Sequence, residues 1–223
     1  ERTRSGKESA IFMIYSEKLL KFKEIIHGFT TRKDPTSSEL GDLVLANQVH
    51  KNNIEVVGIK DKGGIIVKTD GLISKEKGIF LGIRTADCCP ILFYEPAAKI
   101  IGAVHAGWKG SRLKITERLI RQICQIGGIS KNIICVIGPH ICDKCYDIPK
   151  ERQKLFEEKY VKNNCLDLTA VNFDQLLSEG VRKENTEIMS YCTFHQNAQF
   201  FSYRKNQKDK DYGEMLAYIG LDD

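Results

Sequence analysis

The stretch that decides the fold reads IIGAVHAGW over residues 100–108 and leads from an apolar run to a glycine and the chain's single tryptophan. Its β-branched residues predict a strand over residues 100–105 that ends at His105. Ala106 and Gly107 add little side-chain bulk, so we expect that a substrate can approach the backbone closely beside the histidine. A helix is expected to follow from about Ser111.

Outward from this strand, the chain alternates between strand-like and helical patterns. Apolar residues at helical spacing predict helices over 115–126 and 173–181, the second with Asn172 and Gln175 as a capping pair, and a third is expected over 149–162. The fold class is therefore predicted to be α+β, with the first two thirds mainly sheet. The further strands are predicted at residues 53–58, 64–68, 78–84, 89–94 and 132–137.

Length and charge restrict the class of protein. A chain of 223 residues fits a single domain, 1–223, with a core that needs no disulfides. Its 34 basic and 29 acidic residues are interspersed, for a net charge of +5, which favours a solvated surface with an anion-binding cleft over a nucleic-acid-binding protein. Residues 1–7 lack an apolar signal region, and no apolar run approaches the ~20 residues of a membrane span. We expect a cytoplasmic protein whose eight cysteines are reduced.

Two histidines and a cysteine each close an otherwise apolar stretch. These are His50, Cys88 and His105, and two imidazoles with a thiolate form a ligand set that zinc prefers. Three protein ligands leave the fourth position open, as in a catalytic metal site. The pattern by itself does not choose between Cys88 and Cys89. If Cys88 lies on a strand and faces a site, its neighbours Asp87 and Cys89 should face away from it.

Five motifs in order give the chain a resemblance to the YfiH/laccase-domain family, from about residue 25 to the C-terminus. Residues 1–24 are then a variable N-terminal segment. The resemblance implies mixed β-sheets packed together and flanked by helices, a fold related to toxin deamidases. The connection over 33–47 is shorter than the family usually has. The motifs are GFTTR (28–32), QVH (48–50), TADC (85–88), AVHAGW (103–108) and FSYR (201–204).

The resemblance selects Cys88 as the thiolate and implies zinc held by His50, Cys88 and His105, the latter two also being catalytic residues. It further implies a purine nucleoside enzyme that phosphorolyses adenosine, inosine, guanosine or methylthioadenosine and also deaminates adenosine. Zinc can lower the pKa of a bound water to near ~7, as deamination needs. The physiological substrate, the group that protonates the purine and the oligomeric state are not readable from the sequence.

Cations and one aromatic residue are candidates for substrate binding. Trp108 can stack on a purine, or be a large core aromatic. Lys109 and Arg112 follow in a glycine-containing turn that leads into the expected helix, where backbone N–H groups and the two cations can hold phosphate; the turn can also be merely structural. Arg32 is the second phosphate candidate and a candidate catalytic residue, with an exposed ion pair as the alternative.

A second constellation has the paired spacing of a structural zinc site, C-x-x-C at Cys142 and Cys145 followed by C-x-x-H at Cys192 and His195. Buried thiols or a disulfide are the alternatives. The family usually reads GPxIGPCCYE in the first place, and this chain departs at residues 142–144. Cys145 matches and is retained as a candidate catalytic residue.

Rival functions remain open at this point. A multicopper oxidase needs about ten histidine ligands, and the chain has five histidines in all, so copper chemistry is discounted. Cys88 and His105 can instead form the nucleophile and base of a cysteine hydrolase. A zinc amidase that edits a cell-wall precursor nucleotide is a further alternative. A purely structural zinc scaffold is disfavoured because such a site normally has a fourth protein ligand.

Overall fold

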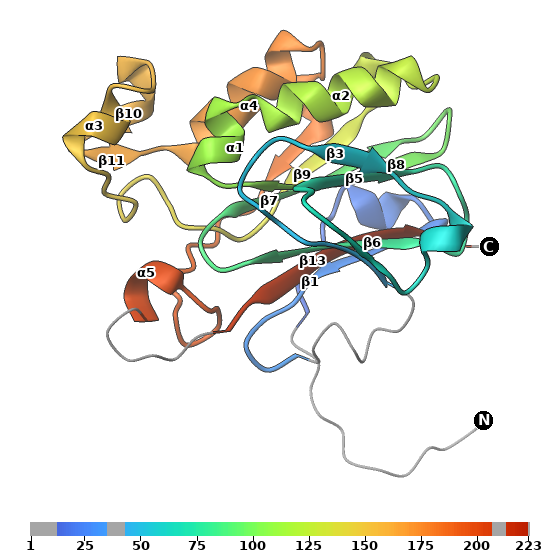
Figure 1. Ribbon diagram of the computed structural model, residues 1–223, viewed down its shortest axis with the longest axis horizontal. Coiled ribbons are helices and arrows are strands. Elements are labelled where there is room, and N and C mark those ends of the chain that lie inside the picture. The colour runs from blue at the N-terminus through green and yellow to red at the C-terminus, as the bar shows by residue number, and fades with distance from the viewer. Residues whose placement is uncertain (1–12, 35–42, 207–212, 223) are drawn as a thin grey trace.

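The computed structural model describes residues 13–34, 43–206 and 213–222, which form two large sheets and a layer of helices (Figure 1). The larger sheet mixes parallel and antiparallel neighbours, with β7 and β8 as an antiparallel pair at its centre. In spatial order its six strands are β12 (Thr186–Ile188), β9 (Ile134–Ile137), β7 (Cys89–Glu95), β8 (Ile100–Ala106), β5 (Gly71–Ser74) and β3 (Ile54–Val56).

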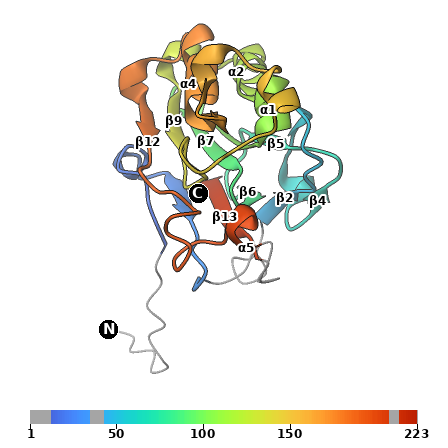
Figure 2. The same ribbon diagram turned by 90° about the vertical axis from the view of Figure 1, so that its left-hand side faces the viewer.

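The second sheet packs against one face of the first, and the helices cover the other face (Figure 2). Its order is β1 (Ile25–Phe29), β13 (Met215–Leu221), β6 (Phe80–Thr85), β2 (Leu43–Ala46) and β4 (Ile65–Ile66). A small hairpin joins β10 (Val161–Lys162) and β11 (Cys165–Leu166). The helices are α1 (Trp108–Arg112), α2 (Ile115–Gln125), α3 (Lys150–Gln153), α4 (Leu168–Ser178) and α5 (Tyr203–Asn206).

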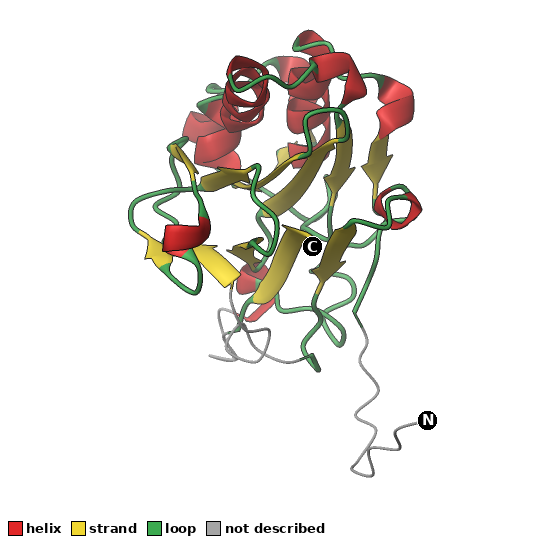
Figure 3. Cartoon of the chain, turned by 90° about the vertical axis from the view of Figure 1, so that its right-hand side faces the viewer, coloured by secondary structure: helices red, strands yellow, loops and turns green. Residues whose placement is uncertain are grey.

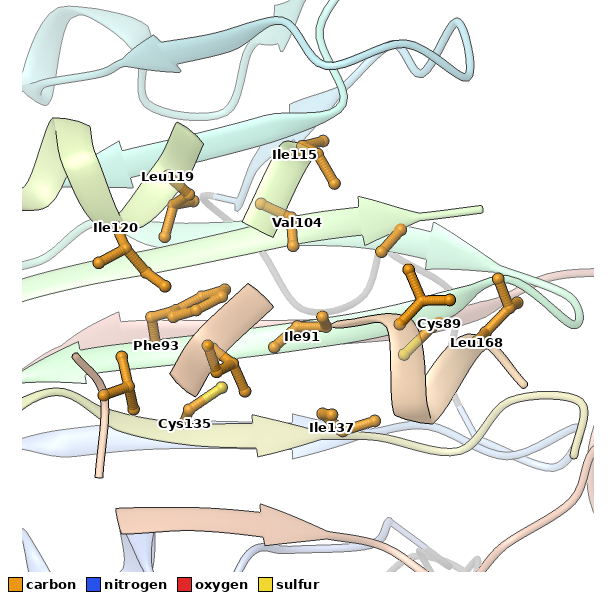
Figure 4. Close-up of a cluster of buried hydrophobic side chains, with 14 of the residues drawn as sticks. Cys89, Ile91, Phe93, Val104, Ile115, Leu119, Ile120, Cys135, Ile137 and Leu168 are labelled. Atoms are coloured by element: carbon orange, nitrogen blue, oxygen red, sulfur yellow. The ribbon is translucent and has the colours of Figure 1, made fainter. Parts of the chain in front are cut away.

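Strand β7 explains why the larger sheet lies in the middle. All seven of its residues are buried, and alternate side chains enter different cores. Ile91 and Phe93 pack under the helices, as Figure 4 shows, whereas Leu92 and Tyr94 pack against the second sheet. A strand buried on both faces is a continuous apolar run, and this pattern made β7 recognisable in the sequence.

The two long helices lie side by side above the larger sheet (Figure 3). Helix α2 turns Leu119 and Ile123 toward that sheet, where both are fully buried. Asp167 caps the N-terminus of helix α4, and its carboxylate accepts a hydrogen bond from the N–H of Ala170 at 2.8 Å. The α+β fold class predicted from the sequence is confirmed.

Two helix predictions were wrong in detail. Residues 149–162 contain only the four-residue α3, a short 3-10 turn and strand β10, because Ile148 and Phe156 pack separately into the core instead of forming a continuous helical face. Asn172 does not cap a helix, since it lies buried within α4. The cap is Asp167, one turn earlier.

Sheet also extends further toward the C-terminus than predicted. Strand β13 occupies the position between β1 and β6 and pairs with both, so the last segment of the chain completes the second sheet. Most of the shortened connection over 33–47 lies outside the described residues, which resume at Leu43. Among the described residues, no helix has the length and apolar character to cross a bilayer.

Candidate active site and metal centre

Three segments far apart in sequence bring His50, Cys88 and His105 together, and we call these three residues the cavity cluster. His50 follows β2 in a loop, Cys88 lies in the turn between β6 and β7, and His105 lies near the end of β8. Their donor atoms all lie within 4.8 Å of one another. A tetrahedral zinc ion holds its ligand atoms about 3.3–3.8 Å apart, so small side-chain movements would suffice. Metal binding itself stays a prediction.

The structure separates the two adjacent cysteines. Cys89 is fully buried in β7, packs in the core under the helices and takes no part in the cavity cluster. Asp87, by contrast, lines the same cavity as Cys88, so the expectation that it faces away was wrong. The reason is that Asp87 has a φ of 91° and lies in a turn, where the alternation of a strand does not hold.

Asp70 supports the cavity cluster from behind. Its Oδ1 lies 2.9 Å from His105 Nδ1 and also accepts the backbone N–H of His50 at 2.9 Å. Oδ2 accepts the N–H groups of Val49 and Lys51. The carboxylate thus holds the loop at His50, a residue whose φ of 56° is unusual for an amino acid with a side chain. Because the carboxylate binds Nδ1 of His105, the Nε2 atom of that ring is left to face the cluster.

Gln48 fixes the neighbouring strand to the same loop. Its side-chain amide donates to the carbonyl of Arg84 at 2.7 Å and accepts that residue's N–H at 2.9 Å. This two-way bond mimics a strand pairing and joins the His50 loop to the end of β6. Gln48, the first residue of the QVH motif, therefore helps to position His50, the third.

The close packing of the cavity cluster shifts the pKa values of Cys88 and His105. Burial alone would raise the pKa of the Cys88 thiol, but His105 and His50 more than offset burial and lower that pKa to about 6. Burial would likewise lower the pKa of His105, but Cys88 and Asp70 raise it to about 9. Both shifts favour a thiolate beside an imidazolium, and a metal ion bound at His105 would replace the proton on its ring.

Gly107 leaves room for the Cys88 sulfur. A Cβ atom at residue 107 would lie 2.8 Å from Cys88 Sγ and 3.6 Å from His50 Cδ2. The space beside His105, which the sequence assigned to an approaching substrate, therefore contains the thiol. The glycine in the AVHAGW motif serves the packing of the cavity cluster.

The cavity cluster opens onto a cavity of about 1000 Å³. That volume is within the range of small-molecule sites and can accept a nucleoside together with an anion. Its wall includes three arginines, two carboxylates and several aromatic rings, an amphiphilic lining suited to a polar ring compound. Beside the cavity cluster, these are Arg84, Arg152, Arg204, Asp87, Glu214, Trp108, Tyr146 and Tyr203.

Only some of the residues predicted to bind substrate line the cavity. Trp108 lines the cavity, and the Arg152 guanidinium lies over its ring at 4.2 Å. Lys109 and Arg112 are exposed and are not among the lining residues, and the helix they belong to, α1, has only five residues. The structure thus gives the phosphate role assigned to these two cations no support, and that role stays a prediction.

Arg32 also lies outside the cavity lining. Its Nε donates to the carbonyl of Phe200 at 2.9 Å, its Nη2 donates to Asn206 Oδ1 at 3.1 Å, and its guanidinium lies 4.3 Å from the centre of the Phe201 ring. These contacts hold the segment that leads into α5. Direct contact of Arg32 with phosphate stays a prediction, and its observed contacts are those of a positioning residue.

Residues 202–204, at the start of α5, line the cavity, although the sequence connected them only with the family resemblance. Arg204 lines the cavity and donates to Asp147, and its backbone N–H donates to Asp87 Oδ2 at 2.6 Å. Asp87 Oδ1 accepts the hydroxyl of Thr193 at 2.6 Å. The FSYR motif was the available signal for this wall. Arg152 had no motif of its own.

Cys145, predicted as a catalytic residue, does not line the cavity. Its neighbour Tyr146 does. The Cys145 sulfur instead lies 3.1 Å from His195 Nε2, in the second constellation noted in the sequence. Its catalytic role stays a prediction without geometric support.

Fold and site together define a single-domain α+β protein in which a histidine–cysteine cluster opens onto a large cavity with an amphiphilic lining. The family model described as multi-copper polyphenol oxidoreductase laccase matches residues 28–222, and the chain belongs to this family.

Curated relatives and solved structures agree with this assignment. The chain is 29% identical over 207 residues to purine nucleoside phosphorylase YlmD of Bacillus subtilis, covering 84% of this chain and 74% of that protein. It is 27% identical over 186 residues to adenosine deaminase RL5 of an unknown prokaryotic organism, covering 75% and 71%. The crystal structure of the hypothetical protein YfiH of Bacillus licheniformis superposes with a TM-score of 0.81 at 25% identity, covering 90% of this chain and 94% of that one.

Proposed function

We propose that this chain is a zinc-dependent purine nucleoside phosphorylase, acting on adenosine, inosine, guanosine or methylthioadenosine, with adenosine deamination as a second activity. One observation carries the proposal: the cavity cluster offers three ligands and opens onto a cavity that also holds arginines and Trp108. The names of the curated relatives support the same reaction classes. Because thiolate ligation requires a reduced cysteine, we also propose a cytoplasmic location.

The donor set fits zinc. Two imidazole nitrogens and one thiolate suit this borderline-soft ion, and Asp70 forms with His105 the carboxylate–histidine link that zinc sites commonly have. When bound, zinc would act as a Lewis acid that polarises an atom of the substrate and lowers the pKa of a water molecule at the open position. The chain's own part is to present the ligand atoms and to hold the substrate beside them.

Phosphorolysis requires phosphate near the sugar. An oxygen of phosphate forms a bond to C1′, the bond from C1′ to the purine nitrogen breaks, and the base leaves with that electron pair and takes up a proton. The arginines in the cavity wall, Arg84, Arg152 and Arg204, can hold the phosphate by paired hydrogen bonds and offset its charge. Trp108 offers a flat surface for the purine.

The proposal is tested by metal content and turnover measured together. Zinc-loaded protein is incubated with adenosine and inosine, with and without phosphate, and free base, sugar phosphate and hypoxanthine are quantified. Release of base that depends on phosphate is the expected result, and chelation should abolish it. Zinc without nucleoside turnover would contradict the proposal and favour the cell-wall amidase.

A matched pair of variants identifies the phosphate contacts. Arg152→Ala should raise the phosphate concentration needed for half-maximal rate by roughly tenfold or more, since a charge-assisted bidentate bond is lost. Arg121→Ala is the control, because Arg121 is exposed on α2, pairs with Glu179, and neither of the two residues lines the cavity. Unchanged phosphate dependence in Arg152→Ala would remove that residue from its role. Arg32→Ala tests the earlier assignment in the same assay.

A cysteine hydrolase remains a second candidate because of the Cys88–His105 pair. The pKa of the Cys88 thiol is lowered to about 6 and that of His105 is raised to about 9, shifts that suit a nucleophile and its acid–base partner. His50 argues for metal, since a hydrolase needs no third ligand. Full activity in chelated protein, together with inactivation by a thiol-alkylating reagent, would favour the hydrolase.

A further inference from the structure

A second group of metal-ligating side chains lies outside the cavity lining, and we call it the four-residue cluster: Cys142, Cys145, Cys192 and His195. The first two belong to a turn that follows β9, and the other two belong to a turn that follows β12. Within each pair, two residues separate the metal-ligating residues, a spacing that lets one tight turn direct both side chains at the same ion.

The side-chain geometry is that of converging ligands. Cys145 Sγ lies 3.1 Å from His195 Nε2, and Cys142 Sγ lies 3.9 Å from the Nδ1 of the same ring. All four donor atoms lie within 4.8 Å of one another. In a tetrahedral zinc site with Zn–S bonds of ~2.3 Å and a Zn–N bond of ~2.0 Å, the ligand atoms are about 3.5–3.8 Å apart. Only one nitrogen of the His195 ring can bind the ion, and donor atoms that lie within 4.8 Å of one another need only small side-chain movements to reach that range.

The backbone holds the two turns together without help from a metal. His140 and Cys192 form a parallel β-bridge, and the N–H of Thr193 donates to the carbonyl of His140 at 3.1 Å. The N–H of Cys142 donates to Cys192 Sγ at 3.4 Å, a contact that favours a thiolate at that sulfur. The N–H groups of Cys145 and Tyr146 both donate to the Cys142 carbonyl and close the first turn.

Four protein ligands distinguish this cluster from the cavity cluster. A site with three cysteines and one histidine saturates a tetrahedral ion and leaves no position for substrate, which is the pattern of structural zinc. We propose that the four-residue cluster binds a structural zinc ion, independently of the cavity cluster. Such an ion would add a link between two segments of the cavity wall that the backbone bridge between His140 and Cys192 already brings together.

Both joined segments contribute residues to the cavity. The first turn leads directly to Tyr146, and the second, which includes Thr193, is followed by α5 with Arg204. Arg204 lies 5.3 Å from the centre of the Tyr146 ring and donates to Asp147, so the two walls meet over the cavity. Zinc in the four-residue cluster would fix the spacing between these walls.

The test counts metal in variants that separate the two clusters. Reduced protein is stripped with chelator, loaded with zinc, dialysed and analysed for zinc per chain by mass spectrometry. We expect two zinc ions in the parent protein, one in Cys88→Ser and one in the double variant Cys142→Ser/Cys145→Ser. Cys124→Ser, an exposed cysteine on α2, is the control and should keep two.

Cobalt spectra provide a readout that does not depend on the folding of the double variant. Cobalt-loaded Cys88→Ser protein should show sulfur-to-metal charge-transfer absorption about three times that of a site with one thiolate, and tetrahedral d–d bands. Chelation of this variant should lower its Tm by roughly 5–10 °C, because the bound ion stabilises the folded state.

The outcomes separate this inference from the proposed function. One zinc in the parent protein and none in Cys88→Ser overturns the inference and leaves the cavity metal intact. One zinc in both proteins, with the three-thiolate cobalt spectrum, supports the inference and contradicts the cavity metal. A disulfide between any two cysteines of the four-residue cluster in zinc-loaded protein overturns the inference.

Discussion

Asp70 Oδ1 lies 2.9 Å from His105 Nδ1, in a position where both groups are almost fully buried. The two residues are 35 positions apart in the sequence. Asp70 directly precedes β5, His105 lies in the adjacent strand β8, and the N–H of His105 also donates to the carbonyl of Asp70 at 2.8 Å. The aspartate therefore fixes the ring by its side chain and the strand by its backbone. Because the same carboxylate accepts the N–H of His50, one residue orients two of the three predicted ligands.

Asp70→Asn should weaken metal binding at the cavity cluster by roughly 10- to 100-fold, as loss of an orienting carboxylate does in zinc sites. The asparagine keeps the size of the side chain but removes the charge that favours a donating Nδ1–H on His105. Competition with a chromophoric chelator measures the change. Asp174→Asn, which alters a carboxylate paired with Lys159 at the surface, should leave the affinity unchanged. Equal affinities for Asp70→Asn and the parent would refute the orienting role.

Gly107→Ala should lower metal affinity at the cavity cluster by at least roughly tenfold while leaving the fold intact. The new methyl group would lie 2.8 Å from Cys88 Sγ, so the sulfur must move out of its position. The φ of Gly107 is −74°, so no backbone strain accompanies the change. The control is Gly58→Ala, where the close atoms belong to the flexible Glu76 side chain. Unaltered zinc affinity in Gly107→Ala would show that the thiol is not held in this place.

Much of the fold could be predicted because its central strands carry their signal locally. Strands β7 and β8 are apolar runs buried on both faces, and α2 shows helical spacing on one face. Strand β13 is also a fully buried apolar run that the prediction overlooked, but its place between β1, at the other end of the chain, and β6 could not be read from the sequence. Pairings across such distances leave no local pattern.

The sequence pointed to the three residues that the structure brings together in the cavity cluster, but it did not indicate most of the residues around them. His50, Cys88 and His105 stood out because polar residues ended apolar stretches. Asp70 could not be assigned to His105 from the sequence, since only the pairing of β5 with β8 brings the two together. Arg152 follows a proline in a segment expected to be helical, and nothing in that pattern indicates that it lies over Trp108.

Asn172→Ala should lower the free energy of unfolding by about 2–4 kcal/mol. The buried amide accepts the hydroxyl of Thr116 at 2.8 Å and donates to Ser111 Oγ at 2.9 Å, so it joins α4 to both α2 and α1. Alanine would leave both hydroxyls without this partner in the core. Denaturant unfolding measures the loss.

The matched control for that change is Asn52→Ala. Asn52 also donates from its side chain to a carbonyl, that of Leu113 at 2.7 Å, but the bond is exposed and water can replace it. We expect a loss below about 1 kcal/mol for this variant. Comparable losses in the two variants would show that burial of the Asn172 network does not add stability.

Acid should destabilise the protein through His27 before most carboxylates titrate. Burial is the main cause that lowers the pKa of His27 from 6.5 to about 4, against a smaller opposing effect of Glu187. The N–H of Ser16 donates to His27 Nε2 at 2.8 Å, and protonation would remove that acceptor. Between pH 6.5 and 4 the unfolded chain therefore binds a proton that the folded chain excludes.

Stability linked to His27 should accordingly be fully present above about pH 6.5 and should decline as the pH falls toward 4, by about 3 kcal/mol in total. His27→Gln retains an acceptor for the N–H of Ser16 but cannot be protonated. Guanidinium unfolding of both proteins at pH 7 and pH 5 separates this residue from carboxylates, which titrate equally in both. The parent should lose more stability than the variant at pH 5. Equal losses in the two proteins would mean that another group causes the acid sensitivity, because the glutamine removes only the titration of residue 27.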